Sequence, residues 1–152
     1  MDMDHNSPEP VVKEDPLVMY LVVRESINMS IGKTAAQCAH ASQMLQMKYE
    51  KLHKSLVYLR KNKDVLLQTP QQLDMIQLEL VFQQWLVVGI RKVVLQADEK
   101  EWVRLKEEYP ENVLVVDAGH TELEPGTETV IGLWPMKKSS RSKLMTRLQV
   151  LK

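Results

Sequence analysis

The stretch Leu17-Val-Met-Tyr-Leu-Val-Val23 is the longest uninterrupted apolar run of the chain, and it decides the fold class. Seven apolar, mostly β-prone residues are typical of a strand that is buried on both faces. The run is far shorter than the ~20 residues that a membrane-spanning helix needs. We therefore expect a sheet that other elements cover on both sides, and no insertion into a membrane.

Outward from this strand, helix and strand patterns alternate along the chain. We expect a loop over 25–32, then a helix from Lys33 to about Tyr49. Thr69 and Pro70 have the residue types of a helix cap and first position, and Gly89 suits the end of that helix. The remaining expected elements are strands over 92–96, 112–116 and 128–133, a loop over 64–69, a short helix after Asp98, and a basic terminal helix over 139–150. The alternation predicts the α/β class, with helices on both faces of the sheet.

Composition narrows the function classes. A length of 152 residues suits one domain, and equal totals of 20 basic and 20 acidic residues give no global attraction to nucleic acid or membrane. The single Cys38 excludes an intrachain disulfide framework, and it also makes a cysteine-rich zinc site untenable. The acidic, polar start does not read as a secretory signal. We expect a soluble intracellular protein, with the cytoplasm as the default location.

Charge is uneven along the chain. Residues 1–16 are acidic and proline-rich, which predicts a disordered tail ahead of a single domain over 17–152. The segments 48–63 and 136–152 are basic. These two segments are either solvated helix faces or patches that face a polyanion, and the sequence alone leaves both alternatives open.

The first expected helix carries a candidate site near its start. Lys33, Gln37 and His40 are spaced by four and three residues, so they share one helix face. An anion there would meet both backbone N–H groups and the Lys33 ammonium. The alternative is a surface lysine with a satisfied histidine, which periodicity alone favours.

The loop after the third strand carries a second candidate site. Asp117 closes an apolar strand, Thr121 follows four residues later, and Thr129 opens the next strand. Ligands of open α/β sheets commonly bind at the carboxyl ends of parallel strands. The alternative is an Asx-type turn with capping threonines, which is equally compatible with these residues.

Both candidate sites lie in motifs that resemble one known family. Leu21-Val-Val-Arg24, Met29 and Gly32-Lys-Thr-Ala-Ala-Gln-Cys-Ala-His-Ala41 look like the first motif of the type 2 (archaeal and eukaryotic) peptidyl-tRNA hydrolases. Trp85, Gly89 and Lys92-Val-Val-Leu95 resemble the middle segment of that family. Its last motif is similar to Asp117-Ala-Gly-His-Thr-Glu-Leu-Glu-Pro-Gly-Thr-Glu-Thr-Val-Ile-Gly132, with Pro135 after it.

The resemblance implies a three-layer α/β/α sandwich around a four-stranded mixed sheet. It implies hydrolysis of the ester that joins a peptide to the 3′-terminal ribose of tRNA, without a metal or an organic cofactor. Peptidyl-tRNA is then the partner, and a homodimer stays an open alternative. The catalytic positions that match the family are Lys33, Asp117, Thr121 and Thr129.

Further positions are expected to bind the substrate. Gln37 and His40 match family motif residues, while Arg24, Lys92 and the terminal helix are candidates for tRNA phosphates, because phosphate contacts carry no base code. His120 stands where the family commonly has an arginine or lysine. We expect Lys33 to stabilise an oxyanion or a phosphate, Asp117 to position Lys33 or polarise water, and the threonines to hydrogen-bond the water, ribose or ester carbonyl.

The chain also departs from the family pattern. Ile31 replaces a usual second lysine, and Trp134 replaces a common glycine. A helical insertion is expected around 48–80, either as an extended first helix or as an extra helix, with packing favoured over tRNA or partner contact. These departures keep a second hypothesis open, that of a non-catalytic RNA-binding or protein-interaction member of the same fold.

Overall fold

The structure is a computed structural model that describes residues 14–62, 69–120 and 122–152. Strand β1 (Leu17–Arg24) comes first and is buried along most of its length. Helix α1 (Ile31–Lys61) and helix α2 (Pro70–Val87) follow it. The remaining elements are β2 (Lys92–Ala97), α3 (Glu99–Glu108), β3 (Val113–Val116), β4 (Glu128–Gly132), β5 (Met136–Lys137), the 3-10 turn η1 (Lys138–Ser140), α4 (Lys143–Arg147) and β6 (Gln149–Val150).

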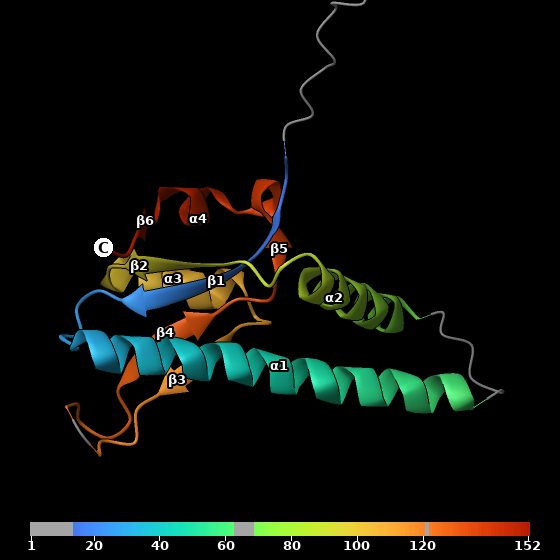
Figure 1. The fold of residues 1–152 in the computed structure, drawn as a ribbon, viewed down its shortest axis with the longest axis horizontal. Helices are drawn as coiled ribbons and strands as arrows, with labels where there is room; N and C mark the ends of the chain where they lie inside the picture. The colour runs from blue at the N-terminus through green and yellow to red at the C-terminus, as the bar shows by residue number, and fades with distance from the viewer. Residues whose placement is uncertain (1–13, 63–68, 121) are drawn as a thin grey trace, which may run out of the picture.

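One mixed sheet organises the fold (Figure 1). Its strands follow the order β3-β4-β1-β2-β6, and β5 pairs with β1 outside this path. Strand β2 is parallel to β1, whereas β4 is antiparallel to both β1 and β3. Strands β1, β2 and β3 therefore end at the same edge of the sheet, where β4 begins. This edge also receives the start of α1.

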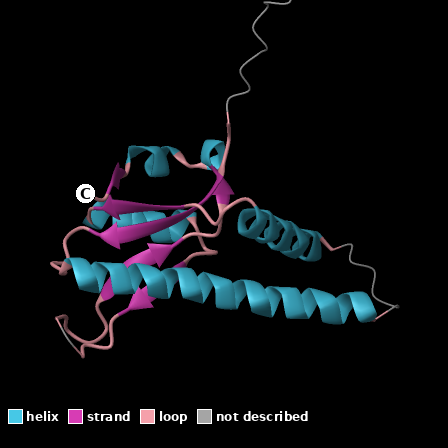
Figure 2. Ribbon diagram, in the orientation of Figure 1, coloured by secondary structure: helices cyan, strands magenta, loops and turns pink. Residues whose placement is uncertain are grey.

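The core consists of two clusters, because successive β1 side chains point to opposite faces. Met19, Leu21 and Val23 belong to a cluster with buried side chains of α1 and α2. The alternate residues Tyr20 and Val22 belong to a second cluster with side chains of α3 and α4. The α/β class and the mixed sheet are confirmed, and Figure 2 shows the helices around the strands.

The expected four-stranded sheet is wrong, since the sheet has six strands within the described residues. The two additional strands are short: β5 pairs with the start of β1, and β6 pairs with β2. The expected basic helix over 139–150 is also wrong. Only Lys143–Arg147 is α-helical, because Ser142 caps that turn and the chain after Leu148 extends to join the sheet.

Helix α1 continues beyond Tyr49, and together with the start of α2 it makes up the described part of the 48–80 region. It ends at Lys61, and α2 begins at Pro70 with a capping box from Thr69 and Gln72. Buried Glu79 of α2 accepts hydrogen bonds from His53 (2.9 Å) and Arg60 (3.0 Å) of α1. Helix α2 ends at Val87 with Val88 as its C-cap, and Gly89 follows with a φ of 123°.

Two expectations fall on residues outside those described. The acidic tail lies outside them up to residue 13, while Asp15 accepts a 2.9 Å hydrogen bond from the Ser139 backbone N–H. The expected 64–69 loop is outside them except for Thr69. In the described part of the chain, no helix has the length and apolarity to cross a membrane.

Candidate active site

The first turn of α1 places Lys33 at the edge of the sheet. The helix begins two residues earlier than expected, with Ser30 as its N-cap, whose Oγ accepts a hydrogen bond from the Lys33 N–H. Glu122 binds this cap from the β3–β4 loop, accepting from the Ser30 N–H at 3.0 Å and from Ser30 Oγ at 2.5 Å. The carboxylate of Glu122 thus ties the loop to the start of the helix.

Asp117 meets Lys33 directly after β3. Lys33 Nζ lies 2.5 Å from Asp117 Oδ1, and the two side chains are 13% and 5% exposed. The other carboxylate oxygen, Oδ2, accepts a 2.8 Å hydrogen bond from the Gly119 N–H. Gly119 has a φ of 80°, and an added Cβ would lie 2.7 Å from the Pro125 backbone nitrogen. Only glycine suits this turn, which holds the carboxylate in place.

Gln37 and Thr129 extend this pair into a buried chain of hydrogen bonds. Gln37 Nε2 donates to Asp117 Oδ1 at 3.1 Å, and Gln37 Oε1 accepts from Thr129 Oγ1 at 3.0 Å. Gln37 is 4% exposed and Thr129 is fully buried. The Thr129 hydroxyl also lies 3.2 Å from the Val115 carbonyl oxygen, which is a second acceptor for its proton. Four of the residues predicted from separate motifs are therefore brought together.

The electrostatics of the cluster favour an ionised Asp117. The hydrogen bond from Lys33 is the main cause that lowers the pKa of Asp117, against the opposing effect of desolvation. The Gly119 N–H and the charges of Lys33 and His120 lower it further. Hydrogen bonds from Ser30 also lower the pKa of Glu122. The result is a fixed ammonium–carboxylate pair at the surface end of a buried network.

Three other predicted residues stand differently. His40 is exposed and lines a hollow beside Val116, rather than joining the Lys33–Asp117 pair. His120 is exposed, three residues after Asp117. Thr121 lies outside the described residues, so its predicted role stays a prediction.

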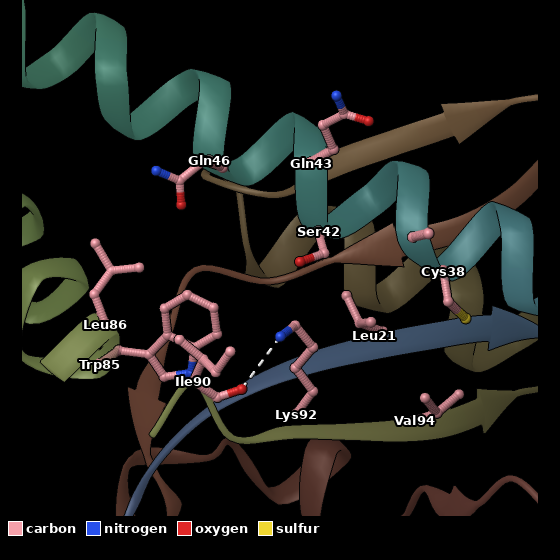
Figure 3. A pocket seen from close by; sticks show the side chains of 11 residues that line it. Leu21, Cys38, Ser42, Gln43, Gln46, Trp85, Leu86, Ile90, Lys92 and Val94 are labelled. Atoms are coloured by element: carbon pink, nitrogen blue, oxygen red, sulfur yellow. Dashed lines mark hydrogen bonds between the residues drawn. The ribbon is translucent and has the colours of Figure 1, made fainter. Parts of the chain in front are cut away.

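Arg24 and Lys92 lie apart from the cluster. Arg24 is held by Glu99 at 2.8 and 3.0 Å, and it also donates to the Glu128 carbonyl oxygen. Lys92 lies in a cavity of about 660 Å³ between α1, β1, β2 and the end of α2 (Figure 3). Its ammonium is 5.1 Å from the centre of the Trp85 ring and donates to the Ile90 carbonyl oxygen, whereas Cys38 lines the far part of the cavity.

Sequence reasoning missed the roles of Ser30 and Glu122. A serine three residues before Lys33 is a recognisable N-cap pattern, and it could have placed the helix start correctly. Glu122 gave no local signal, because its partner lies 92 residues away. Trp134, one of the departures from the family pattern, is buried and packs against Phe82.

Among residues 14–62, 69–120 and 122–152, no three His, Cys, Asp or Glu side chains gather closely enough to hold an ion. The chemistry on offer is that of a fixed cation beside a carboxylate, at a helix start that can receive negative charge.

The known proteins that this chain resembles in sequence are peptidyl-tRNA hydrolases. The model of the family described as "Peptidyl-tRNA hydrolase PTH2" matches residues 17–151. A peptidyl-tRNA hydrolase of Thermoplasma acidophilum is 28% identical, over 88% of this chain and 97% of that protein. One from Methanocaldococcus jannaschii is 30% identical, over 88% and 98%. The human "Peptidyl-tRNA hydrolase 2, mitochondrial" is 30% identical over 77% of this chain and 54% of its own length.

Proposed function

The chain belongs to the peptidyl-tRNA hydrolase PTH2 family, and on that premise we propose that its Lys33–Asp117 cluster is the site of ester hydrolysis. The enzyme hydrolyses the ester between a peptide and the 3′-terminal ribose of tRNA, and so releases tRNA for reuse. The observation that carries the site assignment is the 2.5 Å contact between Lys33 Nζ and Asp117 Oδ1 at the end of a buried hydrogen-bond chain. The non-catalytic alternative gives no reason for this arrangement.

Lys33 is the group that stabilises developing charge. Water adds to the ester carbonyl carbon, and the carbonyl oxygen becomes negatively charged. The bond between the carbonyl carbon and the ribose oxygen then breaks, and the ribose oxygen takes up the proton that the attacking water loses. A held ammonium beside the carbonyl oxygen stabilises this oxyanion without reorganising first. The start of α1 contributes further, because backbone N–H groups there favour negative charge.

Asp117 is better suited to positioning the Lys33 ammonium than to acting as a general base. Its oxygens already accept hydrogen bonds from Lys33, Gln37 and Gly119. Its lowered pKa makes the carboxylate a weak proton acceptor at neutral pH. We therefore assign Asp117 to positioning the ammonium, which is one of the two roles expected for it.

Gln37 and Thr129 act through Asp117. Because Thr129 is fully buried, its hydroxyl is a positioning group and does not contact water, ribose or the ester. The Gln37 side-chain amide accepts from the Thr129 hydroxyl and donates to the Asp117 carboxylate, so Thr129 holds Asp117 in place through Gln37. Thr121 lies outside the described residues, and its hydroxyl stays the proposed hydrogen-bond partner of the water, ribose or ester carbonyl.

The tRNA is bound mainly through phosphates, with Lys92 in its cavity as a candidate contact. Under this proposal the fold is the three-layer α/β/α sandwich of the family, which the two core clusters support. The cytoplasm is the proposed location. A homodimer stays open, and the insertion around 48–80 is proposed to be mainly packing, as the α1–α2 contacts suggest.

The assignment is tested by the release of a labelled N-acetyl-aminoacyl group from tRNA at low salt. We expect release by the wild type with or without EDTA, and a loss of about 10²-fold or more in kcat for Lys33→Ala. Lys61→Ala removes an exposed lysine at the far end of the same helix and is the matched control. Near-normal turnover by Lys33→Ala would overturn the assignment.

A further inference from the structure

The peptide part of the substrate also needs a binding surface, and this inference rests on the proposed function. Nascent peptides differ in sequence, so a general hydrolase gains most from contacts to groups that all peptides share, the backbone N–H and C=O. We propose that the peptide binds as an added strand along the outer edge of β3, parallel to it, with its C-terminal ester carbonyl at the Lys33–Asp117 pair.

Strand β3 has the position that such binding requires. It is the terminal strand of the sheet order, with β4 on its other side, and Figure 1 shows it beside α1. An edge strand can receive an extended peptide through main-chain hydrogen bonds. The strand runs directly into Asp117, so a peptide that follows it parallel ends at the catalytic pair.

The backbone of β3 presents alternate residues to this edge. Asp117 N–H donates to Thr127, and its carbonyl oxygen accepts from Gly126, so the Asp117 backbone faces the β4 side. The Val115 carbonyl oxygen accepts from Thr129 of β4 and faces the same way. Because strand groups alternate, the N–H and C=O of Leu114 and Val116 point away from β4.

A hollow of about 550 Å³ lies beside the same edge, between β3 and α1. Residues 114–116 line one wall, and the side chains on α1 are those of His40, Gln43, Met44 and Met47. Val116 is 51% exposed and Met47 is 52% exposed. Methionine side chains are flexible and adapt to differently shaped partners, which suits a pocket that must accept many peptide side chains.

The distance along the helix fits a short extended peptide. Helix α1 starts at the catalytic end of β3 and passes back along the strand, as the contact of Lys48 Nζ with the Glu111 carbonyl oxygen shows. From Lys33 to His40 the helix rises about 10 Å. Extended peptide covers this length in about three residues. The hollow therefore receives side chains within about three residues of the ester bond.

The first test uses the wild-type enzyme with tripeptidyl-tRNAs that carry one N-methyl group on successive peptide residues. N-methylation removes a single N–H donor. We expect kcat/KM to fall about fivefold to tenfold for methylation at one residue and to stay near that of the parent for its neighbour, since only alternate N–H groups face β3. Equal kcat/KM for all methylated substrates would overturn the proposal.

The second test changes the strand instead of the substrate. Val116→Pro removes the outward N–H, whereas Val116→Thr keeps it and has a similar shape. We expect Val116→Pro alone to lower kcat/KM for tripeptidyl-tRNA by about tenfold, with N-acetyl-aminoacyl-tRNA little affected. Equal losses for both substrates would count against strand addition. Failure here leaves the Lys33→Ala result intact, so the two proposals are separable.

Discussion

The hydroxyl of Thr129 is fully buried and donates to Gln37. Under the proposed function it therefore positions other site residues and does not contact the substrate. Thr129→Val keeps the shape and removes the donor, which loosens Gln37 and, through it, Asp117. We expect kcat to fall about tenfold with KM little changed, the size expected for one hydrogen bond. Single-turnover release from N-acetyl-aminoacyl-tRNA checks this. Val130→Thr changes the neighbouring buried residue, which packs in the core cluster on the α1 side of the sheet, and controls for general damage. A rise in KM for Thr129→Val would instead mean substrate contact.

If the Lys33–Asp117 pair is the active site, the lowered pKa of Asp117 predicts how activity depends on pH. Since the pKa of Asp117 is lowered, the carboxylate stays ionised until the pH falls below its ordinary value of about 3.9. The stabilisation that the pair gives is present above that value and is lost as pH falls through the lower folded pKa. We expect kcat to show no acidic fall from Asp117 between pH 8 and about 5, whereas Asp117→Asn is impaired throughout. An acidic limb centred near pH 6 that Asp117→Asn removes would contradict this.

The sequence predicted this site in part, and the limits are physical. Lys33 and Gln37 share a helix face, and Asp117 closes a strand, so local periodicity was enough to nominate them. The contact between the two motifs depends on β3 and α1 meeting at one sheet edge, which only the family resemblance suggested. Glu122 could not be predicted from the sequence, because nothing in the polar residues around it indicates that it binds Ser30, which is distant in the chain.

Among the elements, α1 and α2 share one buried carboxylate in addition to their apolar contacts. Glu79 is 2% exposed and is held by Arg60 and His53. Arg60→Met keeps the length of the side chain but removes the charged partner. We expect it to lower the free energy of unfolding by about 1–3 kcal/mol, since a buried polar group loses a partner. Urea denaturation measures this, with Lys61→Met as the exposed control; equal stability of the two variants would show that the pair contributes nothing.

The C-terminal segment shows where pattern reasoning fails. Leu144, Met145 and Leu148 have helical spacing, and all three are buried against the sheet. The helix nonetheless spans only Lys143–Arg147, because Ser142 caps its start and Leu151 N–H bonds the Val94 carbonyl oxygen. The pairing of β6 with β2 decides the outcome. Such a tertiary override is invisible to local propensity.

The 152 residues have a formal net charge of zero, so their attraction to tRNA must come from local groups. Lys92 is exposed in a cavity beside α1, on the side of the sheet covered by α1 and α2. If its ammonium neutralises one tRNA phosphate, Lys92→Gln weakens binding at low salt and lowers the slope of log affinity against log salt by about one. Filter binding of deacylated tRNA over a salt series measures the slope. Lys100→Gln, an exposed lysine of α3, removes the same charge and controls for net charge. A matching fall in slope for both variants would show that charge at any position suffices, and an unchanged slope for Lys92→Gln would remove Lys92 from the interface.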